Sequence, residues 1–94
     1  MAIVWSSEAA EDFLQALAYL QERNPAAAIQ LADRVDAVLT RLTEEPIDAP
    51  AQRLRSGKLV RSWPVHPFRL YYQRAGERVL VVRLYHQKRQ PIVR

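Results

Sequence analysis

Apolar residues recur at intervals of three and four positions near the start of the chain. Between Ser7 and Arg23 this stripe consists of Ala10, Phe13, Leu14, Leu17 and Leu20. Such spacing places side chains on one face of an α-helix, where they can be buried together. Ser6 or Ser7 can cap the helix, and the acids that follow favour the positive end of its dipole. The pattern predicts an amphipathic helix over about residues 7–23.

A second apolar stripe follows almost at once. Asn24 is a good N-cap, and Pro25 is tolerated at the first helical position because its missing N–H has no helical partner there. Pro46 forbids continuation of the helix beyond Glu45. The stripe itself contains Ala28, Leu31, Ala32, Val35, Val38, Leu39 and Leu42. The chain is therefore expected to form two long helices in an antiparallel hairpin with a very tight connection.

The remaining pattern is that of strands. Residues 3–5 form a short apolar run, and residues 46–57, with two prolines and a Ser-Gly pair, predict a loop of functional length. From residue 58 onward, strands are expected over 59–63, 68–73 and 79–85, with Ala75-Gly76-Glu77 as a hairpin turn. The predicted order is β-α-α-β-β-β, an α+β fold.

Alternation along the last two strands predicts which side chains share a face. In the first of them, Phe68, Leu70 and Tyr72 should pack on the helices, opposite Arg69, Tyr71 and Gln73. In the last strand one set is Leu80, Val82 and Leu84, and the other is Val79, Val81, Arg83 and Tyr85. Because both sets are largely apolar, one face is expected to be covered by the helices and the other by a partner.

Length and composition restrict the kind of protein. The chain has 94 residues, of which 49% are hydrophobic, which suits one domain over residues 1–94 and is too short for two. There is no cysteine, and two histidines, His66 and His86, cannot furnish a zinc site by themselves. No metal or cofactor is expected. Neither a signal peptide nor an apolar run of about 18 residues is present, so the expected location is the cytoplasm.

The formal charge of +4 is divided unevenly along the chain. Residues 1–48 carry three basic and nine acidic residues (−6), whereas residues 49–94 carry eleven basic residues and one acid, Glu77 (+10). Such polarity suits a protein that meets phosphates or an acidic partner with one surface. Charge does not choose between these two kinds of partner.

Three stretches resemble a known family. The sequence VWSSEAAEDFLQALAYLQERNPAAAIQLADRV at 4–35 looks like the strand-to-helix-hairpin opening of ParE-type toxins. PFRLYYQ at 67–73 and VLVVRLYHQKRQ at 79–90 are similar to the strand pair and His-x-x-Arg ending of the ParE/RelE superfamily. The resemblance implies a helix hairpin packed on one face of a curved, mainly antiparallel sheet. It also implies a type II toxin that is neutralised by a cognate antitoxin, whose C-terminal segment wraps the hairpin and the sheet.

Two mechanisms occur within this superfamily, and fold does not separate them. RelE-like members cleave messenger RNA in the ribosome, whereas ParE-like members inhibit DNA gyrase. A metal-free ribonuclease needs a general base, cations for the phosphorane charge and an acid for the leaving oxygen. The resemblance places Arg69 and Arg89 at positions of phosphate-binding cations, with His86 as a possible acid–base and Arg61 as a further cation.

The ribonuclease set is nevertheless incomplete. The places of the RelE lysine pair hold Val60 and Ser62, and the chain ends at Arg94, short of the place of the RelE C-terminal tyrosine. A histidine at the place of His86 is also common in ParE-like members. We therefore expect a gyrase inhibitor, with a ribosome-dependent endoribonuclease as the first alternative. An inactive or general nucleic-acid-binding relative is the second.

The expected contact residues follow from these readings. An antitoxin is expected to contact Val79, Val81 and Arg83 on the uncovered sheet face. Ordinary structural roles compete with several of the assignments: His86 would then bond to a backbone carbonyl, Trp63 would pack at a strand end, and Trp5 would lie in the core. The target is expected to contact Arg61, Arg69, Tyr71, Arg83, Tyr85, Lys88 and Arg89.

Overall fold

The computed structural model describes residues 2–45, 48–54 and 56–88. Two helices, α1 (Ser7–Arg23) and α2 (Pro25–Glu44), follow a short first strand, β1 (Ala2–Trp5). Four more strands follow within the described residues: β2 (Ala51–Arg53), β3 (Leu59–Val65), β4 (Phe68–Ala75) and β5 (Arg78–His86). The predicted elements are all present. The segment predicted as a loop, 46–57, additionally contains β2, so the observed order is β-α-α-β-β-β-β.

Both helices begin at the predicted caps. The Ser6 Oγ accepts a hydrogen bond from the Ala9 amide at 2.9 Å, and the Asn24 Oδ1 accepts one from the Ala27 amide at 3.4 Å. Each bond satisfies an amide that the first helical turn leaves without an internal partner. A single residue, Asn24, separates the helices, and this confirms the tight antiparallel hairpin.

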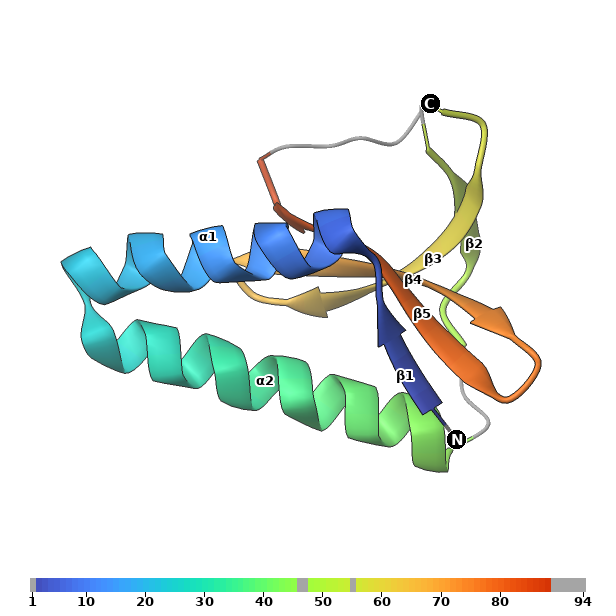
Figure 1. Ribbon diagram of the computed structural model, residues 1–94, viewed down its shortest axis with the longest axis horizontal. Helices are drawn as coiled ribbons and strands as arrows, with labels where there is room; N and C mark the ends of the chain where they lie inside the picture. Colours follow the sequence, from blue (N-terminus) through green and yellow to red (C-terminus); the bar gives the residue numbers. More distant parts are fainter. Residues whose placement is uncertain (1, 46–47, 55, 89–94) are drawn as a thin grey trace.

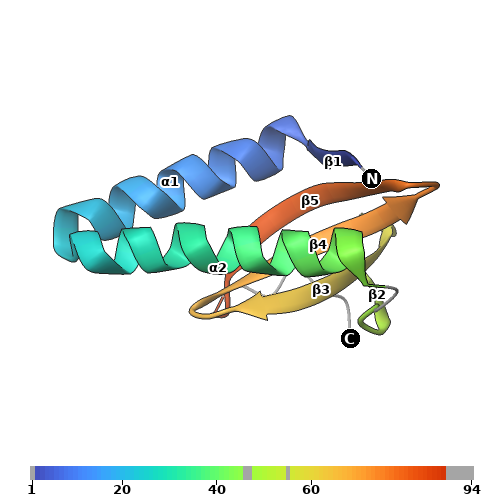
Figure 2. The same ribbon diagram turned by 90° about the horizontal axis from the view of Figure 1, so that it is seen from below.

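The five strands form one mixed sheet in the order β1-β5-β4-β3-β2. β1 runs parallel to β5, and the other neighbours are antiparallel. The helix hairpin lies over one face of this sheet, and its tip extends past the strands in both views (Figures 1 and 2). We call the sheet face away from the helices the open face. None of the helices in the described part of the chain is long and apolar enough to cross a membrane.

The main core fills the space between the helices and the sheet. Phe68, Leu70 and Tyr72 point into it, as predicted, and Trp5 and Trp63 pack partly buried at its margin. Trp63 lies within β3 rather than at a strand end. Alanines on the inner side of α1 leave room for close approach to α2 and β5. The buried helix residues of the core are Ala9, Ala16, Leu31, Val35, Val38, Leu39 and Leu42.

A β-bulge in β5 changes the predicted facing of the last strand. Tyr71 pairs with Arg83 and Tyr72 with Val81, so the register skips Val82. The extra residue shifts the alternation by one position. Val79 and Val81 therefore point into the main core, where both are 0% exposed. Their predicted place on an uncovered face, as antitoxin contacts, is wrong.

The open face carries a small apolar cluster of its own, the open-face cluster. Leu54, Val60 and Tyr71 are buried in it, and Val82 and Tyr85 pack against it from β5. Leu54 follows β2 directly, so the short unpredicted strand brings this leucine under the sheet. The open face is thus partly closed by residues of the predicted loop.

Candidate functional site

Arg69 lies on the open face and is positioned by neighbouring strands. Its Nε and Nη2 donate hydrogen bonds to the Ser62 Oγ at 3.2 and 3.1 Å. Ser62, 3% exposed on β3, in turn donates to the Gln52 Oε1 of β2 at 2.9 Å. No carboxylate within the described residues forms an ion pair with Arg69. The guanidinium is therefore oriented by neutral groups, and its charge is available to an anion.

Two tyrosines lie beside Arg69. Tyr71 and Tyr85 meet edge to face with ring centroids 5.9 Å apart, and Tyr85 is the cross-strand partner of Arg69. Tyr71 is 1% exposed, and burial raises the pKa of its hydroxyl. Tyr71 is thus a support for Tyr85 rather than the surface contact that the sequence suggests.

Arg83 links β5 to the start of α1. Its Nε and Nη2 donate to the two carboxylate oxygens of Asp12 at 2.8 and 3.1 Å, and its Nη1 donates to Glu8 at 2.8 Å. The guanidinium carbon lies 4.4 Å from the ring centroid of Tyr85. The hydrogen bond to Asp12 raises the pKa of Arg83, and an arginine keeps its positive charge in proteins in any case.

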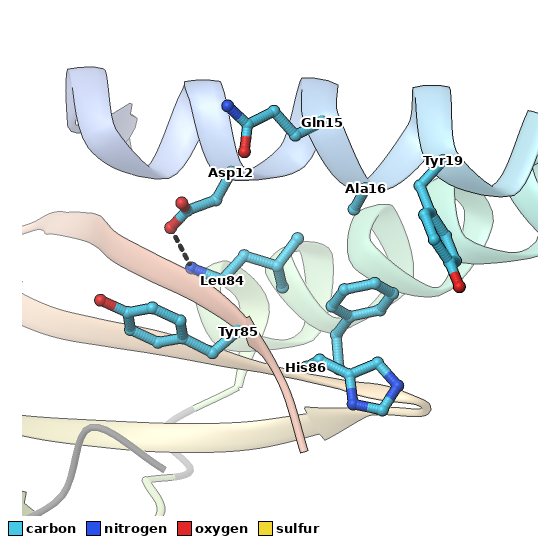
Figure 3. Close-up of a pocket in the computed structure, with 8 residues that line it drawn as sticks. Asp12, Gln15, Ala16, Tyr19, Leu84, Tyr85 and His86 are labelled. Carbon is cyan, nitrogen blue, oxygen red and sulfur yellow. Dashed lines mark hydrogen bonds between the residues drawn. The ribbon is translucent and has the colours of Figure 1, made fainter. Parts of the chain in front are cut away.

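Asp12 is a site residue that the sequence pattern did not identify. Besides Arg83, its carboxylate accepts a hydrogen bond from the Leu84 amide at 3.0 Å, shown as the dashed line in Figure 3. Acids near the start of a helix are usually explained by the helix dipole. The partners of Asp12 lie 71 and 72 positions further along the chain, so no local pattern reveals them.

Arg61 lies on the opposite side of the sheet from Arg69. It pairs across the sheet with Tyr72, whose ring is in the main core, and its Nη1 donates to the Ala49 carbonyl. Nearby, Asp48 accepts hydrogen bonds from the Tyr72 hydroxyl at 3.2 Å and from Arg74 Nε at 2.7 Å. Arg61 is thus part of a structural network under the C-terminal end of α2.

His86 also lies on the helix side, but at the other end of the strands. Its ring meets Phe68 edge to face at 5.3 Å. Its Nδ1 accepts a hydrogen bond from the Lys88 amide at 3.2 Å, whereas the predicted partner of His86 was a backbone carbonyl oxygen. Figure 3 shows Tyr85 and His86 pointing in opposite directions from β5. His86 lines a cavity of about 300 Å³ together with Asp12, Gln15, Ala16, Tyr19, Phe68, Leu84 and Tyr85.

The fold therefore assembles only part of the expected site. Arg69, Tyr85 and Arg83 come together on the open face, with Tyr71 beneath them, and the exposed Lys88 follows the end of β5. Arg61 and His86 lie elsewhere. Arg89 is outside the described residues. Within the described residues, no group of three or more His, Cys, Asp or Glu side chains is placed to hold a metal ion.

Comparisons with known proteins agree with this architecture. The chain is similar to a structure of a chromosomal ParDE TA system from P. aeruginosa, with a TM-score of 0.64 and 17% identity over 92% of this chain and 95% of that chain. It is also similar to a YoeB/ParE toxin from Agrobacterium tumefaciens, with a TM-score of 0.57 and 14% identity over 93% and 99%. No curated protein sequence matches the chain.

The sequence itself matches a family model along nearly its whole length. The model is that of the ParE toxin of the type II toxin–antitoxin system parDE, and it covers residues 3–91. The two structures establish the likeness of fold, and the family model establishes kinship of sequence. The chain therefore belongs to the ParE toxins of type II toxin–antitoxin systems.

Proposed function

We propose that this protein inhibits DNA gyrase in the cytoplasm and is neutralised by a cognate antitoxin. Membership in the ParE family supports the role of toxin. Inhibition would be a binding event: the basic open face contacts the target and stalls its cycle. The surface groups that would make this contact are Arg69, Tyr85, Arg83 and Lys88.

The observation that carries the proposal is the separation of the basic and acid–base groups. A ribonuclease needs its base, its acid and its cations within hydrogen-bond reach of one phosphate. Arg69 lies on the open face, whereas Arg61 and His86 lie on the helix side at opposite ends of the strands. Arg69 is oriented by Ser62 and forms no ion pair with a carboxylate of the described residues. Such an arginine suits binding of an anionic target better than these separated groups suit catalysis.

The test is a supercoiling assay with purified gyrase and relaxed plasmid. We expect micromolar amounts of the full chain to reduce supercoiling. Arg69→Glu should raise the concentration for half inhibition by about tenfold, the effect of roughly 1.4 kcal/mol of lost binding. Arg23→Glu is the matched control, because Arg23 is the exposed last residue of α1, where the helix hairpin turns, and the net charge changes equally. Unchanged supercoiling at these concentrations would rule out gyrase as the target.

A second assay addresses the alternatives. Messenger RNA in a translation extract should stay intact when the protein is added. Cleavage that disappears in Arg69→Ala would replace the proposal with a ribonuclease mechanism. Nucleic-acid binding that falls steeply with salt, without effect on gyrase or messenger RNA, would instead indicate a general binding protein.

A further inference from the structure

A second cavity lies where the open face meets the start of α1. It has a volume of about 290 Å³ and is here called the seam cavity. Leu54, Val82 and Tyr85, all members of the open-face cluster, form its apolar part. Charged and polar side chains surround them: Glu8, Ser56, Lys58 and Arg83. An apolar floor with cations at its rim fits an aliphatic side chain that carries a carboxylate nearby.

The two carboxylates on Arg83 are unequal. The Asp12 side chain is 15% exposed, makes two hydrogen bonds to the guanidinium and accepts a third from Leu84. The Glu8 side chain is 69% exposed and makes one bond at 2.8 Å. Exposed ion pairs are weak because water and side-chain entropy compete with them. Glu8 can therefore leave Arg83 while Asp12 keeps the arginine in place.

Lys58 adds a second cation to the rim. It is exposed, and its ammonium forms no ion pair with any carboxylate of the described residues. Arg83 and Lys58, which both line the seam cavity together with the apolar residues, thus offer two positions for carboxylates. In a bound segment, the apolar anchor would supply affinity, and the two charge pairs would fix the position of the segment along the site.

We propose that the seam cavity is a docking site for an antitoxin segment of mixed aliphatic and acidic residues. An aliphatic side chain enters between Leu54, Val82 and Tyr85. One carboxylate of the segment replaces Glu8 on Arg83, and another pairs with Lys58. Glu8 then acts as an internal competitor that occupies the partner's position in the free toxin. The identity of the occupant rests on the proposed function, whereas the chemistry of the site does not.

The test measures binding of a short fluorescein-labelled peptide of alternating leucine and glutamate to the full chain by anisotropy. Heteronuclear NMR of the labelled protein locates the peptide. We expect shift changes at Glu8, Lys58 and the amides of β5 from Val82 to Tyr85. A peptide with serine in place of leucine should bind much more weakly, because the apolar anchor is lost. Equal binding of both peptides would leave only non-specific attraction and overturn the proposal.

Two pairs of variants test the charges. Glu8→Gln should bind the peptide up to about fivefold more tightly, the value of one exposed ion pair, while Glu11→Gln, which removes a charge from the same helix, should not. Lys58→Glu should weaken binding about tenfold, whereas Arg78→Glu, an equal charge reversal at the other end of β5, should not. Weaker or unchanged binding in Glu8→Gln would refute the competitor role.

Other outcomes are equally decisive. Shift changes confined to another surface would place the peptide elsewhere and overturn the assignment. Concentration-dependent changes at the seam without peptide would identify a second copy of the chain as the occupant instead. The peptide experiment contains no gyrase, so its result is independent of the supercoiling assay. If the peptide binds at the seam cavity but the protein does not inhibit gyrase, the proposed target is rejected and the docking site is retained.

Discussion

At the scale of single residues, three arginines of the strands are oriented by different kinds of partner. Asp12 orients Arg83 at the edge of the sheet, and Asp48 accepts a hydrogen bond from Arg74 under α2. Arg69 has a hydroxyl as its partner instead. The three arginines are similar in sequence context, each lying within a strand. Their different roles depend on which acids the fold brings near them, and this could not be predicted from the strand pattern.

Asp48 is expected to make stability depend on acid. Burial opposes its ionisation, but the hydrogen bond and charge of Arg74 outweigh burial, and the pKa of Asp48 is lowered from its usual 3.8. A carboxyl with a lowered folded pKa stabilises the fold above its unfolded pKa, and this contribution is lost as pH falls through the folded pKa. Because the pair is partly exposed, the contribution is at most about 1 kcal/mol.

The measurement is the urea midpoint between pH 6 and pH 2.5. Asp48→Asn should be less stable than the wild type at pH 6, and the difference should shrink below about pH 3.8 as the wild type loses its charge. Asp33→Asn is the control, since Asp33 is exposed on α2 and forms no ion pair within the described residues. A difference that stays constant with pH would contradict the assigned role of Arg74.

At the scale of elements, local sequence signals are sufficient to predict the bounds of the helices but not the pairing of the strands. Helix bounds follow from an apolar period and from caps within a few residues, so Ser6, Asn24 and the two stripes predict them well. The bulge in β5 depends on how that strand pairs with β4, and β2 has only three residues. The bulge and β2 both depend on pairing between residues that are distant in the sequence. Because the bulge shifts the alternation of β5, the sequence pattern places Val79 and Val81 on the wrong face.

Ser6 joins the cap of α1 to the bulge. Its Oγ accepts from the Ala9 amide and donates to the Val82 carbonyl, both at 2.9 Å. Ser6→Ala should therefore cost about 1–2 kcal/mol of unfolding free energy, the upper range for a lost N-cap. Ser7→Ala, at the next, exposed position, should cost less than about 0.5 kcal/mol. The free energies of unfolding are measured by denaturant titration. Equal losses in the two variants would show that the hydrogen bond from Ser6 to Val82 does not stabilise the fold.

At the scale of the whole molecule, the sheet divides the arginines between its two faces, which a charge count along the sequence cannot show. The second half of the sequence carries +10, yet Arg61 and Arg74 are used on the helix side and Arg69 and Arg83 on the open face. Arg69 and Arg83 were both predicted as target contacts, and the structure places them on the same face of the sheet. The sequence could not predict that His86 and Arg61 lie apart from them, because the side each residue takes depends on register and on the bulge.

Because His86 and Arg69 lie on opposite sides of the sheet, substitutions of the two residues should have different effects. If gyrase is bound through the open face, His86→Gln should inhibit supercoiling as the wild type does, while Arg69→Glu is impaired. A ribonuclease that used both groups would instead lose messenger RNA cleavage in either variant. Thermal unfolding followed by circular dichroism should first show that both variants are folded, since His86 packs against Phe68. Impaired gyrase inhibition in folded His86→Gln would mean that the binding surface extends around the end of β5 to the helix side, and the open face would no longer account for the activity.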